Sequence, residues 1–101
     1  MACGAPDQDT LPPLEVSAAE AVVHGHVRVG GEPLPGAYVR LLGSDGEFTA
    51  EVQTSATGYF RFYAADGDWT LRTLSRGAEP VDTAVTATKG QAVEATVEVP
   101  A

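Results

Sequence analysis

Short stretches of alternating apolar and polar residues, each closed by a turn rich in glycine or proline, most constrain how this chain can fold. Successive side chains of a β-strand point to opposite faces, so a stretch with this period buries one face and exposes the other. No stretch of helix length shows the 3.6-residue period of a packed α-helix. The chain is therefore predicted to be all-β.

The alternating stretches cover residues 21–29, 37–42, 47–52, 59–63, 69–74, 80–88 and 91–99. Short strands at this spacing, with a turn signal between them, are typical of two packed antiparallel sheets. We expect a seven-stranded Greek-key β-sandwich. The alternation predicts that the inward positions are Val23, Gly25, Val27, Val29, Ala37, Val39, Leu41, Phe48, Ala50, Val52, Phe60, Phe62, Trp69, Leu71, Val93, Ala95, Val97 and Val99.

The first 20 residues differ from the rest of the chain. They contain three prolines and scattered acids, and they show no periodicity. We expect a disordered N-terminal arm over residues 1–20 and one β-sandwich domain over residues 21–100.

The charge balance restricts the partners. The formal net charge is −8, from 14 acidic and 6 basic residues, and Lys89 is the sole lysine. Phosphate backbones and anionic membranes need clustered cations, so we expect no nucleic acid and no membrane as partner.

One cysteine cannot form an internal disulfide and suits a reducing compartment, and no signal peptide is visible. The expected location is the cytoplasm, and no cofactor is expected.

Several segments resemble known families. "VHGHVRVGGEPLPGAYVRLL", "TSATGYFRF" and "GDWTLR" resemble the carboxypeptidase regulatory-like, or transthyretin-like, sandwich. "AYVRLL", "EFTAEV", "SATGYFRF" and "DWTLR", with a Cys-Gly start followed by proline, resemble a small bacterial domain-of-unknown-function family, number 1416. Some members of that family are named for an association with sulfurtransferases. The resemblance implies this fold and this association, and it implies no activity.

Cys3 is the first candidate functional residue. A thiol near a chain end can reach into a partner's active site, where it could accept sulfur by attack on a persulfide. The neighbouring Asp7 and Asp9 would raise the pKa of this thiol, which disfavours the reactive thiolate. The alternative is a cysteine with no function.

His24 and His26 are the second candidate. Two residues apart on a strand, they share a face and could bind one metal ion. A third ligand would have to come from a neighbouring strand, and Arg28 in the same row would repel a cation. The alternative is a pair of solvated surface histidines.

The third candidate is a set of outward tyrosines and arginines. If their strands are neighbours, these residues share one sheet face and form a binding surface of types enriched in hot spots. The alternative is ordinary cross-strand pairing on a solvated face. The set is Tyr38, Arg40, Tyr59, Arg61, Tyr63 and Arg72.

No catalytic triad, phosphate loop or pair of catalytic carboxylates is present in the sequence. We therefore interpret the chain as a non-enzymatic accessory or protein-interaction module, linked through Cys3 to a protein partner such as a sulfurtransferase. One alternative is a small metal- or ligand-binding protein or enzyme that uses His24 and His26. A structural role in an oligomer is another alternative.

Overall fold

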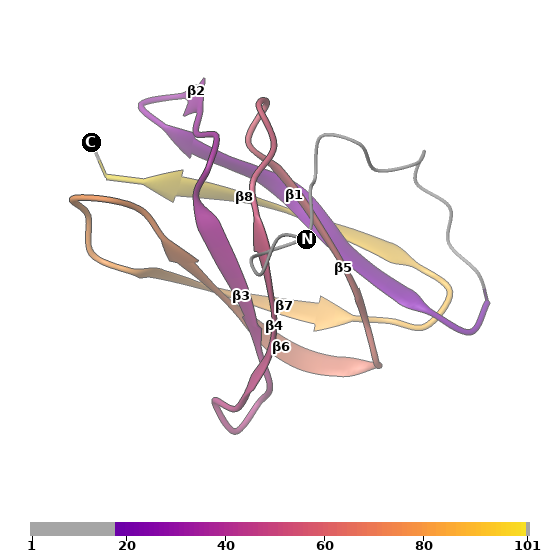
Figure 1. Cartoon of the computed structure of the whole chain (residues 1–101). Coiled ribbons are helices and arrows are strands. Elements are labelled where there is room, and N and C mark those ends of the chain that lie inside the picture. The colour runs from indigo at the N-terminus through magenta and orange to yellow at the C-terminus, as the bar shows by residue number, and fades with distance from the viewer. Residues whose placement is uncertain (1–17, 101) are drawn as a thin grey trace, which may run out of the picture.

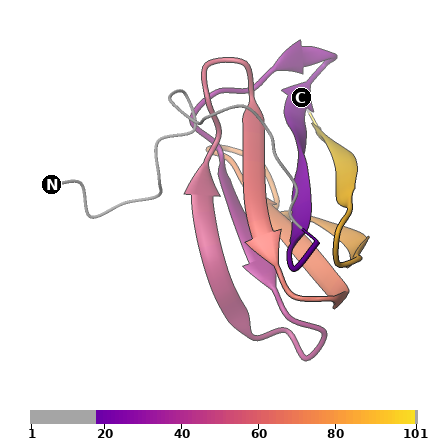
Figure 2. The same ribbon diagram turned by 90° about the vertical axis from the view of Figure 1, so that its right-hand side faces the viewer.

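Two β-sheets packed face to face make up the fold (Figure 1, Figure 2). The computed structural model describes residues 18–100, and that range contains no helix able to cross a membrane. The strands are β1 (Ala21–Val29), β2 (Glu32–Pro33), β3 (Tyr38–Leu42), β4 (Phe48–Gln53), β5 (Tyr59–Ala64), β6 (Gly67–Leu74), β7 (Val81–Ala87) and β8 (Ala92–Val99).

One sheet has the antiparallel order β4-β3-β6-β7. In the other sheet β1 is central, with β5 antiparallel on one side and β8 parallel on the other. The chain passes between the sheets after β2, after β4, after β5 and after β7. The predicted seven-stranded Greek-key β-sandwich is confirmed, with one additional strand, β2.

The additional strand β2 arises from a tight glycine turn. Gly30 and Gly31 both have positive φ angles, 58° and 82°, which few other residues tolerate. A two-residue turn with this geometry matches the twist of antiparallel strands. It pairs Glu32 with Val29 and Pro33 with Arg28, so a segment that the sequence presents as a turn contains a short strand.

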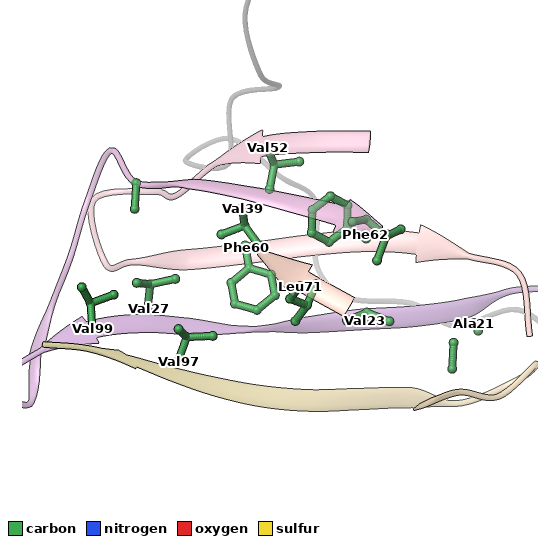
Figure 3. Close-up of a cluster of buried hydrophobic side chains, with 13 residues drawn as sticks. Ala21, Val23, Val27, Val39, Val52, Phe60, Phe62, Leu71, Val97 and Val99 are labelled. Carbon is green, nitrogen blue, oxygen red and sulfur yellow. The ribbon is translucent and has the colours of Figure 1, made fainter. Parts of the chain in front are cut away.

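The core lies between the sheets, as the alternation predicts (Figure 3). The rings of Phe60 and Phe62 lie 6.2 Å apart between their centroids. Leu71 is fully buried, and Trp69 packs against the cluster at its edge. The buried aliphatic side chains that surround these rings include Val23, Val27, Val39, Leu41, Val52, Val97 and Val99.

The prediction that Phe48 faces the core is wrong, because its side chain is 57% exposed. The β3–β4 register shifts at this point. Leu41 pairs with Ala50, but the next residue, Leu42, pairs with Phe48. Thr49 is therefore an extra residue in β4, and such a bulge turns the side chain before it to the opposite face.

Gly25 allows β1 to lie between its two neighbours. It pairs with Phe60 on β5 and with Ala95 on β8. A β-carbon at Gly25 would overlap the carbonyl oxygen of Ala95. The parallel β1–β8 pairing therefore requires a residue without a side chain at this position.

We expect Gly25→Ala to lower the free energy of unfolding by about 3 kcal/mol, because the added methyl would force β8 away from β1. Urea denaturation followed by the fluorescence of Trp69 measures the change. The control is Gly43→Ala, where the nearest atom to the new methyl is a flexible Asp45 side-chain oxygen at 3.1 Å. Equal effects of the two substitutions would contradict this account of Gly25.

Two buried threonines differ in how their hydroxyl groups are satisfied. Within the described range, the Thr73 hydroxyl has no hydrogen-bond partner, although only 1% of the residue is exposed. The Thr54 hydroxyl accepts a hydrogen bond from the Ala37 N–H at 2.9 Å and donates one to the Leu34 carbonyl at 2.8 Å. A buried hydroxyl without a partner costs stability, whereas a paired one does not.

We expect Thr73→Val to raise the free energy of unfolding by about 1 kcal/mol, because it replaces this hydroxyl with a methyl of similar size. Thr54→Val, the matched control, should lower it, because two backbone groups lose their partner. Thermal unfolding of the two variants tests the pair. A destabilised Thr73→Val variant would instead show that the Thr73 hydroxyl of the wild type has a hydrogen-bond partner.

Candidate functional site

The outer face of the β1–β5 pair gathers rings and an arginine from two strands that are distant in the sequence. His24 pairs with Arg61 and His26 with Tyr59. Val23 on β1 and both Phe60 and Phe62 on β5 point into the core, so the residues next to them along each strand point outward. We call the resulting surface the ring face; its residues are His24, His26, Tyr59, Arg61 and Tyr63.

The turn before β5 sets the position of Tyr59. The Gly58 N–H donates to the Ser55 carbonyl at 2.9 Å, and Gly58 has a φ of 76° that suits glycine. The Ser55 hydroxyl accepts from the N–H groups of Thr57 and Tyr59, at 3.2 and 3.1 Å. The residues Ser-Ala-Thr-Gly therefore form a closed turn that fixes the start of β5.

Tyr59 is the centre of the ring face. The Arg61 Nε–H donates to the Tyr59 hydroxyl at 3.2 Å, and that hydroxyl lies 3.1 Å from His24 Nδ1. Because the hydroxyl oxygen accepts from Arg61, its proton is free to be donated to His24 Nδ1, which leaves the imidazole proton on Nε2. The rings of His24 and His26 lie edge-on to Tyr59, at 5.8 and 5.3 Å between centroids.

The environment of His24 favours its neutral form. Burial lowers the pKa of His24 below its ordinary value of 6.5. Glu94, opposite on β8, raises the pKa, and the positive charges of Arg61 and His26 lower it. At neutral pH His24 is therefore a hydrogen-bond acceptor at Nδ1 and a donor at Nε2.

Arg61 lies on the outer face but is only 8% exposed. Burial acts to lower its pKa, but hydrogen bonds to Tyr59 and Tyr63 outweigh it and raise the pKa above the ordinary value. The guanidinium carbon also lies 5.5 Å from the centre of the Tyr59 ring, within cation–π distance. The sequence predicted an outward Arg61 but gave no sign that it would be covered.

The structure does not bring the six outward tyrosines and arginines together on one surface. Tyr59, Arg61 and Tyr63 lie on β5 in one sheet. The other three lie on β3 and β6 in the other sheet, whose outer face is on the opposite side of the sandwich; they are Tyr38, Arg40 and Arg72.

On that opposite face the arginines are paired with acids. Arg40 binds Glu51 at 2.8 Å, and Arg72 binds both carboxylate oxygens of Asp82, at 2.8 and 3.0 Å. The hydrogen bond with Asp82 raises the pKa of Arg72, and that with Arg72 lowers the pKa of Asp82. Exposed pairs of this kind are ordinary cross-strand contacts that contribute little stability.

The described residues supply no third ligand for a metal ion at His24 and His26. His24 and His26 share a face, as predicted, but both contact Tyr59. Residues 18–100 contain no group of three or more His, Cys, Asp or Glu side chains that could hold a metal ion. Cys3 and the predicted arm as far as residue 17 lie outside the described residues.

One end of the sandwich is hollowed, with a volume of about 320 Å³. Its walls include Val29, Leu34 and Val99, and Ser75 and Arg76 supply its polar side chains. None of the residues that line this hollow is a histidine, cysteine or carboxylic acid. It offers space for a small apolar group but no acid or base for catalysis.

A family model described as "Protein of unknown function (DUF1416)" matches residues 3–99. The chain belongs to this family. The uncharacterized proteins Rv0814c and Rv3118 of Mycobacterium tuberculosis are each 55% identical to the chain over 75 residues, which are 72% of this chain and 75% of theirs. An uncharacterized protein of Mycolicibacterium smegmatis is 58% identical over 57 residues, 55% of this chain and 63% of that protein.

Solved structures show the same sandwich. GBS52, the minor pilin of Streptococcus agalactiae, aligns with a TM-score of 0.68 and 21% identity over 81% of this chain and 44% of the pilin. Chlorocatechol 1,2-dioxygenase of Pseudomonas putida aligns with a TM-score of 0.65 and 14% identity over 100% of this chain and 69% of the enzyme. The chain spans less than half of the pilin. At these identities the similarity shows the fold alone.

The lowered pKa of His24 predicts that stability depends on pH. The unfolded chain binds a proton at the ordinary pKa and the folded chain at a lower one, so the free energy of unfolding should fall as the pH drops from 7 through 6.5. Urea denaturation at several pH values measures this slope. His24→Gln should reduce it, and His26→Gln, the matched control, should retain it. An equal slope in wild type and His24→Gln would contradict the prediction.

Proposed function

We propose that this protein is a non-enzymatic interaction module of the cytoplasm that binds a sulfurtransferase through the ring face and accepts sulfur on Cys3. The observation that carries the docking part is the organised cluster around Tyr59. Its hydroxyl is held by Arg61 and His24, so the rings are fixed before a partner arrives. Preorganised aromatic and arginine side chains bind partners with little loss of conformational entropy.

Tyr63 provides accessible area on this face, since it is 49% exposed and lies on the same strand as Tyr59 and Arg61. Tyr38, 40% exposed, is its counterpart on the opposite face of the sandwich. There the neighbouring arginines form ion pairs with acids, whereas on the ring face Arg61 is hydrogen-bonded to Tyr59 and Tyr63 and so holds the tyrosines in place. The ring face is therefore the better candidate for a partner.

The sulfur-accepting part rests on Cys3, the single cysteine, and on the resemblance of the sequence to proteins named for sulfurtransferases. The Cys3 thiolate would attack the outer sulfur of a persulfide on the partner's cysteine. A new S–S bond forms on Cys3, the partner's S–S bond breaks, and its electron pair remains on the partner's thiolate, which takes up a proton. No external oxidant or reductant is needed.

The first test measures binding. A sulfurtransferase from the organism of origin, loaded with sulfane sulfur from thiosulfate, is titrated with the protein by calorimetry. We expect Tyr63→Ala to weaken binding about tenfold, as for an interface hot spot. Tyr38→Ala, the matched control, should bind like wild type. Equal binding by both variants would overturn the assignment of the docking face.

The second test measures sulfur transfer. After incubation with the loaded enzyme, the intact mass of the wild type should increase by one sulfur atom, and that of Cys3→Ser should not. Dithiothreitol should reverse the increase. Binding without any mass increase would overturn the acceptor role of Cys3 but leave the docking role in place. Failure to bind would overturn the whole proposal.

A further inference from the structure

The hollow at one end of the sandwich is built from segments that are distant in the sequence. The end of β1, the segment after β2, the turn after β6 and the end of β8 meet there (Figure 1). No residue of the ring face lines it. Its volume of about 320 Å³ is at the lower end of the range for small-molecule sites. A water molecule occupies about 30 Å³ in the liquid, so the hollow suits a ligand of roughly ten non-hydrogen atoms.

One wall of the hollow, residues 34–37, offers a ligand no free backbone donor. The N–H groups of Leu34, Gly36 and Ala37 all donate hydrogen bonds within the protein, and Pro35 has no N–H. Thr54 accepts two of these bonds, from Gly36 at its carbonyl (3.1 Å) and from Ala37 at its hydroxyl (2.9 Å). A polar group of a ligand would therefore find no donor on this wall.

Apolar side chains complete this part of the hollow. Val29, Leu34 and Ala78 line it together with the buried Val99. The first three are only half-buried, so part of their apolar surface is in contact with water. Removing such surface from water is favourable in proportion to its area. An aliphatic chain is therefore the group that this part of the hollow would hold.

The polar side of the hollow is the turn formed by residues 75–78. The Ala78 N–H donates to the Ser75 carbonyl at 3.4 Å, and Gly77 has a φ of 77°, as the third residue of a type II turn does. Arg76 is the second residue of this turn. Within residues 18–100, the side chains of Ser75 and Arg76 form no hydrogen bond or ion pair. Both are therefore available as donors to a ligand.

Arg76 differs in this respect from other arginines of the described chain. Arg40 and Arg72 form ion pairs with acids, and Arg61 donates to a tyrosine hydroxyl. Among residues 18–100, none that lines the hollow is a carboxylic acid. A guanidinium can bind a carboxylate through two parallel hydrogen bonds, which are stronger than those between neutral groups. The hollow therefore combines apolar walls with a cation that has no acid beside it.

We propose that this hollow binds a short aliphatic carboxylate. The hydrocarbon chain lies against Val29, Leu34 and Val99, and the carboxylate accepts hydrogen bonds from the Arg76 guanidinium and the Ser75 hydroxyl. The apolar wall gives the site its preference for a chain, and Arg76 gives it the preference for an anion. The site is separate from the ring face and does not depend on whether Cys3 accepts sulfur.

The test titrates the full chain, labelled with ¹⁵N and with ¹³C at methyl groups, with hexanoate at pH 7. We expect saturable NMR shifts confined to the residues of the hollow, with a dissociation constant on the order of 1 mM for so small a ligand. The ligand methyl should show NOEs to the methyl groups of Leu34 and Val99. Shifts that do not saturate, or that lie outside the hollow, would overturn the proposal.

Two further ligands separate the contributions of chain and charge. Acetate lacks the chain, and hexan-1-ol lacks the charge. Each should bind about tenfold more weakly than hexanoate, because one loses apolar contact and the other a charge-assisted hydrogen bond. Equal binding of hexan-1-ol and hexanoate would overturn the assignment to an anion. Equal binding of acetate would overturn the role of the apolar wall.

Variants identify the residues that bind. Arg76→Gln, an exposed change in a turn, should weaken hexanoate binding about tenfold and leave hexan-1-ol unaffected. Arg72→Gln, the matched control, removes the same charge from the outer face of β6 and should bind hexanoate like wild type. Ala78→Leu should fill the hollow and abolish the binding of both ligands, with the amide spectrum confirming the fold. Equal affinity of wild type and Arg76→Gln for hexanoate would overturn the proposal.

Discussion

The close approach of β1 to β8 at Gly25 is the contact on which the rest of the structure depends. The Ala95 carbonyl occupies the space that any side chain at this position would need. The approach allows eight residues of β1 to pair in parallel with β8 while its other edge pairs with β5. Because β1 is the central strand, its register determines which residues of β5 and β8 meet on either face.

The ring face is a direct consequence of this register. His24 lies between Arg61 on β5 and Glu94 on β8, and His26 lies beside Tyr59. A shift of one residue would send the histidines into the core and Val23 to the surface. Hydrophobic burial on the inner side therefore fixes the polar arrangement on the outer side. The polar cluster of the ring face therefore follows from the packing of an ordinary hydrophobic core.

The sequence predicted the fold well because the alternation is a local signal. The inward positions of Val23, Phe60 and Leu71 follow from the period alone. The inward prediction for Phe48 failed because the bulge at Thr49 depends on pairing with β3, which no local pattern records. The candidate site was predicted only in part. His24 and His26 were recognised as a pair on one face, but their contacts with Tyr59 depend on the β1–β5 register. The predicted set of tyrosines and arginines is split between two opposite faces, because β3 and β5 belong to different sheets.

Tyr59, held by Arg61, donates its hydroxyl proton to His24 and so fixes the ring face. The most direct measurement is the long-range ¹H–¹⁵N NMR correlation of the His24 ring at neutral pH. We expect a single neutral tautomer, with the proton on Nε2 and with an Nδ1 chemical shift that moves in Tyr59→Phe. Rapid exchange between the two tautomers in the wild type, with no response to Tyr59→Phe, would contradict it.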